Sequence, residues 1–321
     1  MHYLVTGGGG FIGSHLTEEL LNRGHQVTII DNFITGQRHR IAPDAKLVEA
    51  DIRYHSAIAE HFVGVDGVFH TAAYPRVPRS IKQPMLSHDI NTNGTQNVLE
   101  AAAKAGVKRL VFSGSSTPYG NQDTLPLHED MRVSPMCPYA AQKIACELYC
   151  SVYSQLYNLE TVCLRYFGVY GKHMVMDDEF AMAVPAFIKA RLENKTITIF
   201  GDGKVTRDFT HVSDVVRANI LAMEADTVGK AEIINIGAGN NISVNKLAEA
   251  IGCKSEYGEA RYEPNDTLAD NSKARELLKW EPTIPFDTGM RELVNYYVTD
   301  DIKKQEAYES ERTTEREKET A

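Results

Sequence analysis

Short apolar runs alternate with longer amphipathic stretches through most of the chain. Runs at 3–5, 26–30, 46–50, 67–73 and 109–113 carry few charges, as buried parallel strands require. The stretches between them repeat apolar residues at helical spacing, and those at 11–21 and 91–105 end near a glycine. Strands that alternate with helices in this way predict an α/β fold with a Rossmann-like, doubly wound parallel sheet.

A glycine-rich turn at 6–13 (TGGGGFIG) joins the first predicted strand to the first predicted helix. Glycines at 7, 10 and 13 suit a tight turn, the close approach of a pyrophosphate, and close packing of helix on strand. The free amides at the helix start attract an anion. Asp31 ends the next strand, where a carboxylate accepts hydrogen bonds from a ribose 2′-hydroxyl and repels a 2′-phosphate. The sequence therefore predicts an NAD site rather than an NADP site.

Composition narrows the class of protein. The 321 residues are 43% hydrophobic and 24% charged, which is ordinary for a globular protein. A formal net charge of −9 argues against nucleic-acid and anionic-membrane partners, because phosphates would be repelled. Five cysteines without CxxC pairs predict a reducing, cytoplasmic environment and no metal ion. Residue 2 already leads into a strand, so no signal peptide is expected, and no apolar run has membrane-span length.

The pattern also predicts how the chain divides. Later strands are expected at 164–170, 197–201 and 233–237, and from Lys246 to Trp280 the pattern becomes mixed α+β. We expect an NAD-binding Rossmann domain of residues 1–165 plus about 211–236. A smaller mixed α+β lobe of about 166–210 plus 237–298 would bind the substrate. The charged tail at 299–321 has few apolar residues and is expected to be a frayed helix or disordered.

A tyrosine and a lysine open the helix predicted from 138 to about 157. Tyr139 and Lys143 are four residues apart, so they lie on one helix face. An ammonium group near a phenol stabilises the phenolate, so Tyr139 can act as a base near neutral pH. The base would take its proton from an alcohol of the substrate. Ser115, just after the strand at 109–113, can hold that alcohol by a hydrogen bond. Parallel strands end at one edge, so this edge should also carry Asp31, Asp51, Ala72, Ala73 and residues 113–116.

Several motifs in order resemble the NAD-dependent epimerase/dehydratase family, the extended short-chain dehydrogenase/reductases that act on nucleotide sugars. The similarity covers about residues 2–295. The motifs are TGGGGFIGSHL at 6–16, DN at 31–32, DI at 51–52, HTAA at 70–73, NTNGT at 91–95, LVFSGSSTPYG at 110–120, YAAQK at 139–143, RYFGVYG at 165–171, RDFTHVSD at 207–214 and NIGAGNNIS at 235–243.

The resemblance implies roles for individual residues. Tyr139 would take the proton of the sugar C4 hydroxyl as hydride leaves to NAD, Lys143 would hold the nicotinamide ribose, and Ser115 would bind the same hydroxyl. The residues implied to contact NAD are Gly7, Gly10, Phe11, Ile12, Gly13, Asp31, Asn32, Asp51, Ile52, Ala72, Ala73, Ser113, Tyr139, Lys143 and Tyr166. Those implied to contact the UDP-sugar are Ser115, Ser116, Thr117, Thr198, Phe200, Arg207 and Arg261.

Within the substrate set, the resemblance places Arg207 on the nucleotide diphosphate as a bidentate cation. Thr198 and Phe200 would lie beside the base, and Arg261 is the candidate for a second arginine. The chain also departs from the family pattern. Gly168 stands where asparagine is usual, and Gln142 stands where serine is common. Ser116 and Thr117 stand where 4,6-dehydratases carry an Asp-Glu pair. Because this acid/base pair is missing, the resemblance argues against 4,6-dehydration.

The residues implied to line the substrate site are compatible with two enzymatic functions and with one function that is not enzymatic. Thr267 falls about where 4-epimerases carry a gatekeeper, and its small side chain favours a 2-acetamido sugar. The first hypothesis is 5,6-dehydration of UDP-N-acetylglucosamine with hydride returned to C4. The alternative is 4-epimerisation of UDP-glucose or UDP-N-acetylglucosamine. The third is an NAD-dependent sensor, which would not need Tyr139 and Lys143. The resemblance further implies a homodimer in which the helices near 91–105 and 139–157 form a four-helix interface.

Overall fold

A seven-stranded sheet forms the centre of the protein, which we describe from a computed structural model for residues 1–175, 182–259 and 266–299. The strand order is β11-β6-β5-β4-β1-β2-β3, and every neighbouring pair is parallel. The strands are β1 (His2–Thr6), β2 (Gln26–Asp31), β3 (Lys46–Glu49), β4 (Gly67–His70), β5 (Arg109–Ser113), β6 (Glu160–Tyr166) and β11 (Lys230–Ile236). This order, which reverses at β1, confirms the predicted doubly wound α/β fold.

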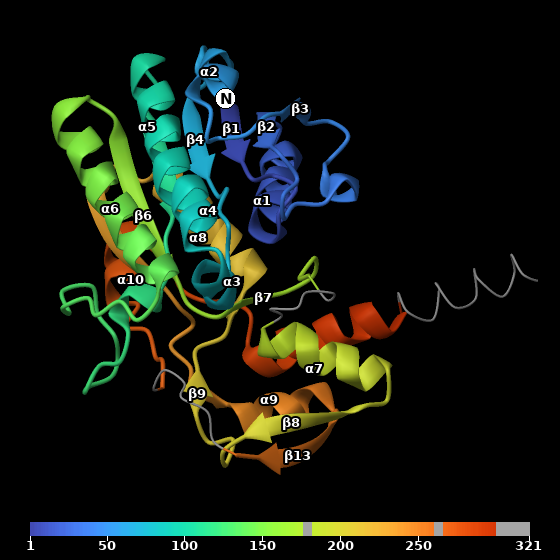
Figure 1. Cartoon of the computed structure of the whole chain (residues 1–321). Helices are drawn as coiled ribbons and strands as arrows, with labels where there is room; N and C mark the ends of the chain where they lie inside the picture. Colours follow the sequence, from blue (N-terminus) through green and yellow to red (C-terminus); the bar gives the residue numbers. More distant parts are fainter. Residues whose placement is uncertain (176–181, 260–265, 300–321) are drawn as a thin grey trace, which may run out of the picture.

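Helices cover both faces of this sheet (Figure 1). One face is packed by α1 (Phe11–Asn22), α8 (Val212–Glu224) and α10 (Ser272–Leu278), whose apolar side chains share a core with the strands. The other face is packed by α2 (His55–Ile58), α5 (Gly94–Lys104) and α6 (Pro138–Leu156). Each fully buried Leu, Ile or Val contributes about 1.5–3 kcal/mol. Among the described residues, every helix is too short or too polar to span a bilayer.

A smaller lobe lies below the sheet in Figure 1. It contains α7 (Ala183–Leu192), the parallel pair β8 (Thr196–Phe200) and β13 (Lys254–Gly258), α9 (Val244–Ile251), and helical residues 286–299. Its own apolar core includes Ile188, Ile199 and Leu247. Two short pairs join this lobe to the sheet domain: β7 (Val169–Tyr170) with β10 (Thr210–His211), and β9 (Thr206–Arg207) with β12 (Ile242–Ser243).

The helix predicted at 91–105 begins later than predicted and follows a segment of another helix type. Residues Asp89–Asn93 form a π-helical segment, η3, and α5 begins only at Gly94. Before it come α3 (Val77–Lys82) and α4 (Pro84–His88). A π-turn inserts one extra residue and frees backbone groups, and such turns often lie at functional sites.

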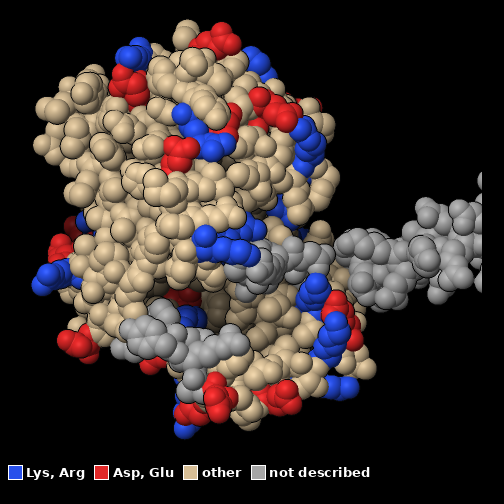
Figure 2. All heavy atoms as spheres, viewed as in Figure 1, with Lys and Arg blue, Asp and Glu red and all other residues tan. Residues whose placement is uncertain are grey.

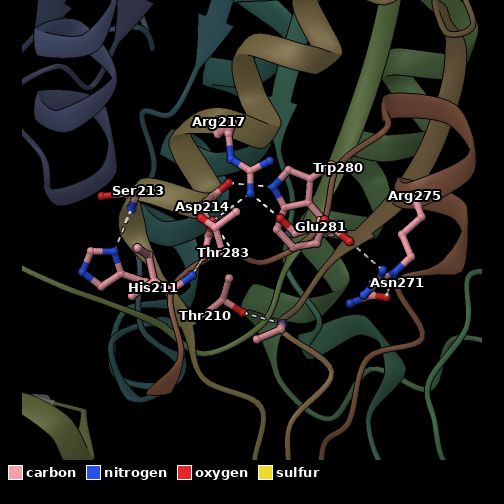
Figure 3. A network of polar contacts seen from close by, with 12 residues as sticks. Thr210, His211, Ser213, Asp214, Arg217, Asn271, Arg275, Trp280, Glu281 and Thr283 are labelled. Carbon is pink, nitrogen blue, oxygen red and sulfur yellow. Dashed lines mark hydrogen bonds and ion pairs between the residues drawn. The ribbon is translucent and has the colours of Figure 1, made fainter. Parts of the chain in front are cut away.

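The start of α8 is fixed by a polar network that joins it to the chain after α10 (Figure 3). The sequence predicts Ser213 or Asp214 near the cap, and both lie in the first turn; the cap itself is His211, whose Nδ1 accepts from the Ser213 amide. The Asp214 carboxylate instead accepts from the Thr283 amide and hydroxyl, at 3.0 and 2.7 Å, and the Trp280 indole donates to the Asp214 carbonyl at 2.8 Å. Asp214 therefore holds the segment that leads to the last helix.

Candidate active site

The glycine turn after β1 forms a cradle with no room for side chains. Gly7 has φ +75°, and a Cβ there would lie 2.7 Å from the Ala72 Cα. A Cβ on Gly13 would collide with the Gly7 carbonyl oxygen. Helix α1 begins at Phe11 with Gly10 as its cap, so no side chain occupies its first amides. A cradle that a single methyl group would fill, open at a helix N-terminus, fits the pyrophosphate of NAD.

Asp31 lies at the carboxyl end of β2, as predicted. It is buried, and its two oxygens accept from the Gly9 amide at 2.8 Å and the Phe33 amide at 2.7 Å. Burial raises the pKa of Asp31, although these two amides oppose the rise. Each carboxylate oxygen can accept a second hydrogen bond. The position suits ribose hydroxyls.

Asn32, Asp51 and Ile52 are brought together beside Asp31. The Asn32 amide donates to Asp51 at 2.8 Å, and Arg53 donates to Asp51 from Nη2 at 2.7 Å. Burial opposes ionisation, yet these donors lower the pKa of Asp51, so it stays charged. Ile52 is buried and packs against Gly94, where an added Cβ would lie 2.7 Å from its Cδ1. Together they form an apolar floor with a polar rim, as an adenosine requires.

His70, which sequence reasoning left without a role, links the cofactor loop to the π-helical segment. The Ala72 amide donates to Thr6 Oγ1 at 3.2 Å, and Thr6 Oγ1 contacts His70 Nδ1 at 2.7 Å. His70 Nε2 contacts Thr95 Oγ1 at 2.9 Å, and Thr95 donates to the Asn91 carbonyl at 2.6 Å. Because the Thr95 hydrogen is already donated, His70 carries its proton on Nε2. The chain of hydrogen bonds thus fits neutral His70, whose Nδ1 accepts from the Thr6 hydroxyl.

Burial and then the charge of Lys143 lower the pKa of His70 to about 3. The unfolded chain binds a proton near the ordinary value of about 6.5, so folding loses about 1.4 kcal/mol for each pH unit below it. We expect unfolding in urea to show that His70→Gln loses about 2 kcal/mol less than the natural chain between pH 7 and pH 5. The exposed His88→Gln variant is the control. Equal losses for all three proteins would contradict a neutral buried His70.

The predicted catalytic residues lie where β5 and α6 meet. Lys143 is almost fully buried, and its Nζ donates to the Ser113 carbonyl at 2.8 Å. The same Nζ lies 5.7 Å from the centre of the half-buried Tyr139 ring. Ser115 Oγ accepts from the Thr117 amide at 3.2 Å and hydroxyl at 3.0 Å, so its own hydrogen is left to donate. The arrangement can therefore hold and deprotonate an alcohol.

Tyr166 is fixed beneath this site. Its hydroxyl contacts Ser113 Oγ at 3.1 Å and donates to Asn219 Oδ1 at 2.9 Å. Burial raises the pKa of Tyr166 to about 12, so the phenol stays neutral. Asn219, on α8, was not predicted, because nothing in the local sequence shows that a helix on the opposite face reaches this tyrosine. Tyr166 can pack against a bound ring but not act as a base.

Three of the predicted substrate residues lie in or beside the smaller lobe, which Figure 2 shows separated from the sheet domain by a hollow in the surface. Thr198 and Phe200 lie two residues apart on β8, so they share one face. Arg207 ends β9, and its Nη1 donates to the Thr206 carbonyl at 2.8 Å. Ser116 and Thr117 follow Ser115 at the sheet edge. Arg261 lies outside the described residues.

A buried carboxylate fixes the strand that carries Arg207. Asp208 accepts from the amides of Ala238, Gly239 and Ala269 at 2.9–3.0 Å, which joins three separate segments. Burial raises the pKa of Asp208 to about 6 despite these donors. A Cβ on Gly168 would collide with the Asp208 carbonyl. The glycine that replaces the usual asparagine is therefore required by the close approach of this segment.

The fold and site define a dinucleotide-binding protein with a Tyr–Lys pair at the carboxyl edge of a parallel sheet. The family model described as "NAD dependent epimerase/dehydratase family" matches residues 3–237. The chain belongs to this family, and its cofactor is NAD.

Individual relatives agree with this assignment. A putative UDP-glucose 4-epimerase from Methanocaldococcus jannaschii is 38% identical over 91% of this chain and 97% of its own. The solved structure of UDP-glucose 4-epimerase with UDP-glucose from Thermotoga maritima matches with TM-score 0.88 and 34% identity over 94% of this chain and 99% of its own. UDP-N-acetylglucosamine 4-epimerase from Methanobrevibacter ruminantium, in complex with UDP-N-acetylmuramic acid, matches with TM-score 0.88 and 32% identity over 93% and 98%.

Proposed function

We propose that this protein oxidises the C4 hydroxyl of a UDP-hexose or UDP-hexosamine and then reduces the same carbon, giving the C4 epimer. The geometry around Tyr139, Lys143 and Ser115 supports the first half of this cycle. The 4-epimerases among the relatives support the second half. The proposal assigns catalysis to these three residues and NAD binding to the glycine cradle with Asp31.

Each catalytic group has a defined task in this proposal. Ser115 donates its hydrogen to the C4 oxygen and orients it, since its lone pairs are used by Thr117. Tyr139 removes the C4 hydroxyl proton, and the Lys143 ammonium stabilises the phenolate. A bound NAD would supply reversible hydride transfer at C4. Lys143 has two hydrogens left after its bond to the Ser113 carbonyl, which suit the nicotinamide ribose.

The smaller lobe would hold the nucleotide. Arg207 would meet the diphosphate, whose charge a guanidinium binds in bidentate fashion. Phe200 and Thr198 would lie against the base, and Ser116 and Thr117 against the sugar. We also propose the division into an NAD domain of 1–165 plus about 211–236 and a substrate lobe of about 166–210 plus 237–298. The cytoplasmic location and the lack of a metal ion remain predictions.

The observation that favours epimerisation is the chemistry of residues near the sugar site. Loss of water across C5–C6 needs a base for the C5 proton as well as Tyr139. Ser116 and Thr117 carry no carboxyl group, and burial raises the pKa of the Cys137 thiol, which caps α6. These positions therefore supply no strong base near neutral pH. Epimerisation needs only Tyr139, Lys143, Ser115 and NAD.

The second candidate is 5,6-dehydration of UDP-N-acetylglucosamine, the reaction of the dehydratase of tunicamycin assembly, an antibiotic pathway. It is favoured by the altered sugar pocket. Gly168 replaces asparagine, and the Thr267 hydroxyl oxygen accepts a hydrogen bond from the Asp208 amide at 3.3 Å. A small side chain there leaves room for a 2-acetamido group.

Product mass separates the two candidates. The protein is incubated with UDP-glucose and with UDP-N-acetylglucosamine, and products are identified by mass spectrometry and NMR. We expect a product of unchanged mass with inverted C4. A product lighter by one water would refute epimerisation and support the dehydratase, and no conversion of any UDP-sugar would refute both.

We further propose that the protein is a homodimer. On α6, Leu148, Val152 and Leu156 are 64%, 42% and 72% exposed and four residues apart, so they form one apolar stripe beside α5. Leu148→Lys should weaken self-association about 100-fold, because its charge would be buried in the interface. Sedimentation velocity at micromolar concentration tests this, with the exposed Val63→Lys as control. A natural chain that sediments as a monomer would contradict the proposal.

A further inference from the structure

Gln142, the residue before Lys143, is buried in a polar network between α6 and the segments before α5. Its Oε1 accepts from Ser87 Oγ at 2.8 Å and from Asn91 Nδ2 at 2.8 Å. Ser87 lies on α4 and Asn91 in the π-helical segment, and all three side chains are at least nine-tenths buried. The serine common at position 142 in the family is two atoms shorter and would not span this gap.

Asn91 also forms hydrogen bonds with the loop beside the cofactor cradle. Its Oδ1 accepts from the Tyr74 amide at 2.7 Å, and its Nδ2 donates to the Tyr74 carbonyl at 3.2 Å. Two bonds to the backbone of one residue hold Tyr74 in place within the loop at 71–76, which also contains Ala72 and Ala73. The next residue but one, Arg76, has φ +88°, a conformation that non-glycine residues adopt only when their surroundings impose it.

A second contact joins the same segments at the start of α6. The helix cap, Cys137, makes no side-chain hydrogen bond to the helix. The Tyr139 amide instead donates to Ser80 Oγ at 3.2 Å, and Ser80, on α3, donates to the Val77 carbonyl at 2.7 Å. One of the unpaired amides of this helix end is thus satisfied from another helix.

We infer that Gln142 is a positioning residue for Tyr139, which it holds by locking the first turns of α6 to the π-helical segment and, through Asn91, to the loop at 71–76. On the other side, Lys143 is fixed to the Ser113 carbonyl. The helix that carries the base is therefore held from two sides, and the loop that borders NAD belongs to the same buried unit. This inference rests on the proposed function for its kinetic consequence only.

The test replaces Gln142 by methionine, which is similar in length but accepts no comparable hydrogen bond. Because a misplacement of about 1 Å costs roughly 10²-fold in rate, we expect kcat to fall about 10- to 100-fold with KM for the UDP-sugar changed less than about threefold. The isotope effect on a UDP-sugar deuterated at C4 should increase, since the chemical step becomes limiting. Lower stability alone would not change that isotope effect.

A readout that does not depend on turnover is amide hydrogen exchange. The Tyr74 and Tyr139 amides should exchange faster in Gln142→Met than in the natural chain. Gln155→Met, on an exposed part of the same helix, should leave exchange and kinetics unchanged. Ser87→Ala removes one donor to Gln142 and should give the same signature at smaller amplitude if the methionine variant does not fold.

The outcomes distinguish the positioning role of Gln142 from the proposed epimerase function. Unchanged exchange at Tyr74, or a rise in KM with kcat unchanged, would overturn the inference. Faster exchange in a protein that converts no UDP-sugar would support the buried lock and refute the proposed function instead.

Discussion

Tyr139→Phe is expected to lower kcat by about 10²–10⁴-fold while leaving NAD bound. The change removes one oxygen from a half-buried ring and leaves the ring beside Lys143. Ser115 can still orient the C4 hydroxyl, but no group remains to take its proton. Steady-state kinetics on the UDP-sugar, together with the NAD content of the purified protein, measure both effects.

The control for this variant is Tyr149→Phe, on the same helix and also half-buried. It should keep the kcat of the natural chain. If Tyr139→Phe retained a tenth or more of the natural kcat, the base would have to lie elsewhere. A phenylalanine variant that lost NAD would instead show that Tyr139 serves mainly to bind the cofactor.

Gly13→Ala is expected to remove NAD binding almost entirely. The new Cβ would collide with the Gly7 carbonyl oxygen and lie 2.8 Å from Thr71 Oγ1, so the turn that cradles the pyrophosphate must open. Forcing extra volume into such a close contact costs about 1–3 kcal/mol of stability. NAD affinity should fall at least about 100-fold, because the amides at the start of α1 no longer converge. Calorimetric titration with NAD and thermal unfolding measure the two losses.

Gly24→Ala provides a matched control. Gly24 follows α1 with φ +79°, and a Cβ there meets nothing within 4 Å. Alanine in this conformation should cost about 1 kcal/mol of stability and leave NAD affinity unchanged. If both variants bound NAD equally well, the glycine cradle would not be the pyrophosphate site.

Much of the sheet domain follows from local sequence. The glycine turn, the apolar strands and Asp31 are close together in the chain, so their spacing alone predicts the strand–helix–strand unit. The helix at 138–157 was predicted almost to the residue, since α6 covers Pro138–Leu156. Its pattern of apolar residues is long and regular, which makes the period unambiguous.

The π-helical segment and the buried polar contacts were not predictable in the same way. A π-turn adds one residue to a helical pattern without changing its composition, so Asp89–Asn93 reads as ordinary helix. Hydrogen bonds such as Asn91 to Gln142 and Tyr166 to Asn219 join residues 51 and 53 positions apart, and only the tertiary fold brings them together. The departure at Gln142 was the one local sign that position 142 has a special role.

The cap of α8 shows how tertiary contacts replace a local rule. Ser213 and Asp214 are both good cap residues by type. The structure uses Asp214 to bind the Thr283 and Ile284 amides, and its charge is paired with Arg217 at 2.8 Å. Asp214 lies in the first turn of α8, where its carboxylate binds a segment far along the chain, and His211 is the cap.

The central claim is that Tyr139 and NAD act on C4 and that the hydrogen removed from C4 returns to C4. The most direct measurement uses a UDP-sugar deuterated at C4, incubated with the protein and analysed by NMR. The account predicts that product and recovered substrate both keep deuterium at C4. Exchange of that deuterium for solvent hydrogen during turnover would contradict it.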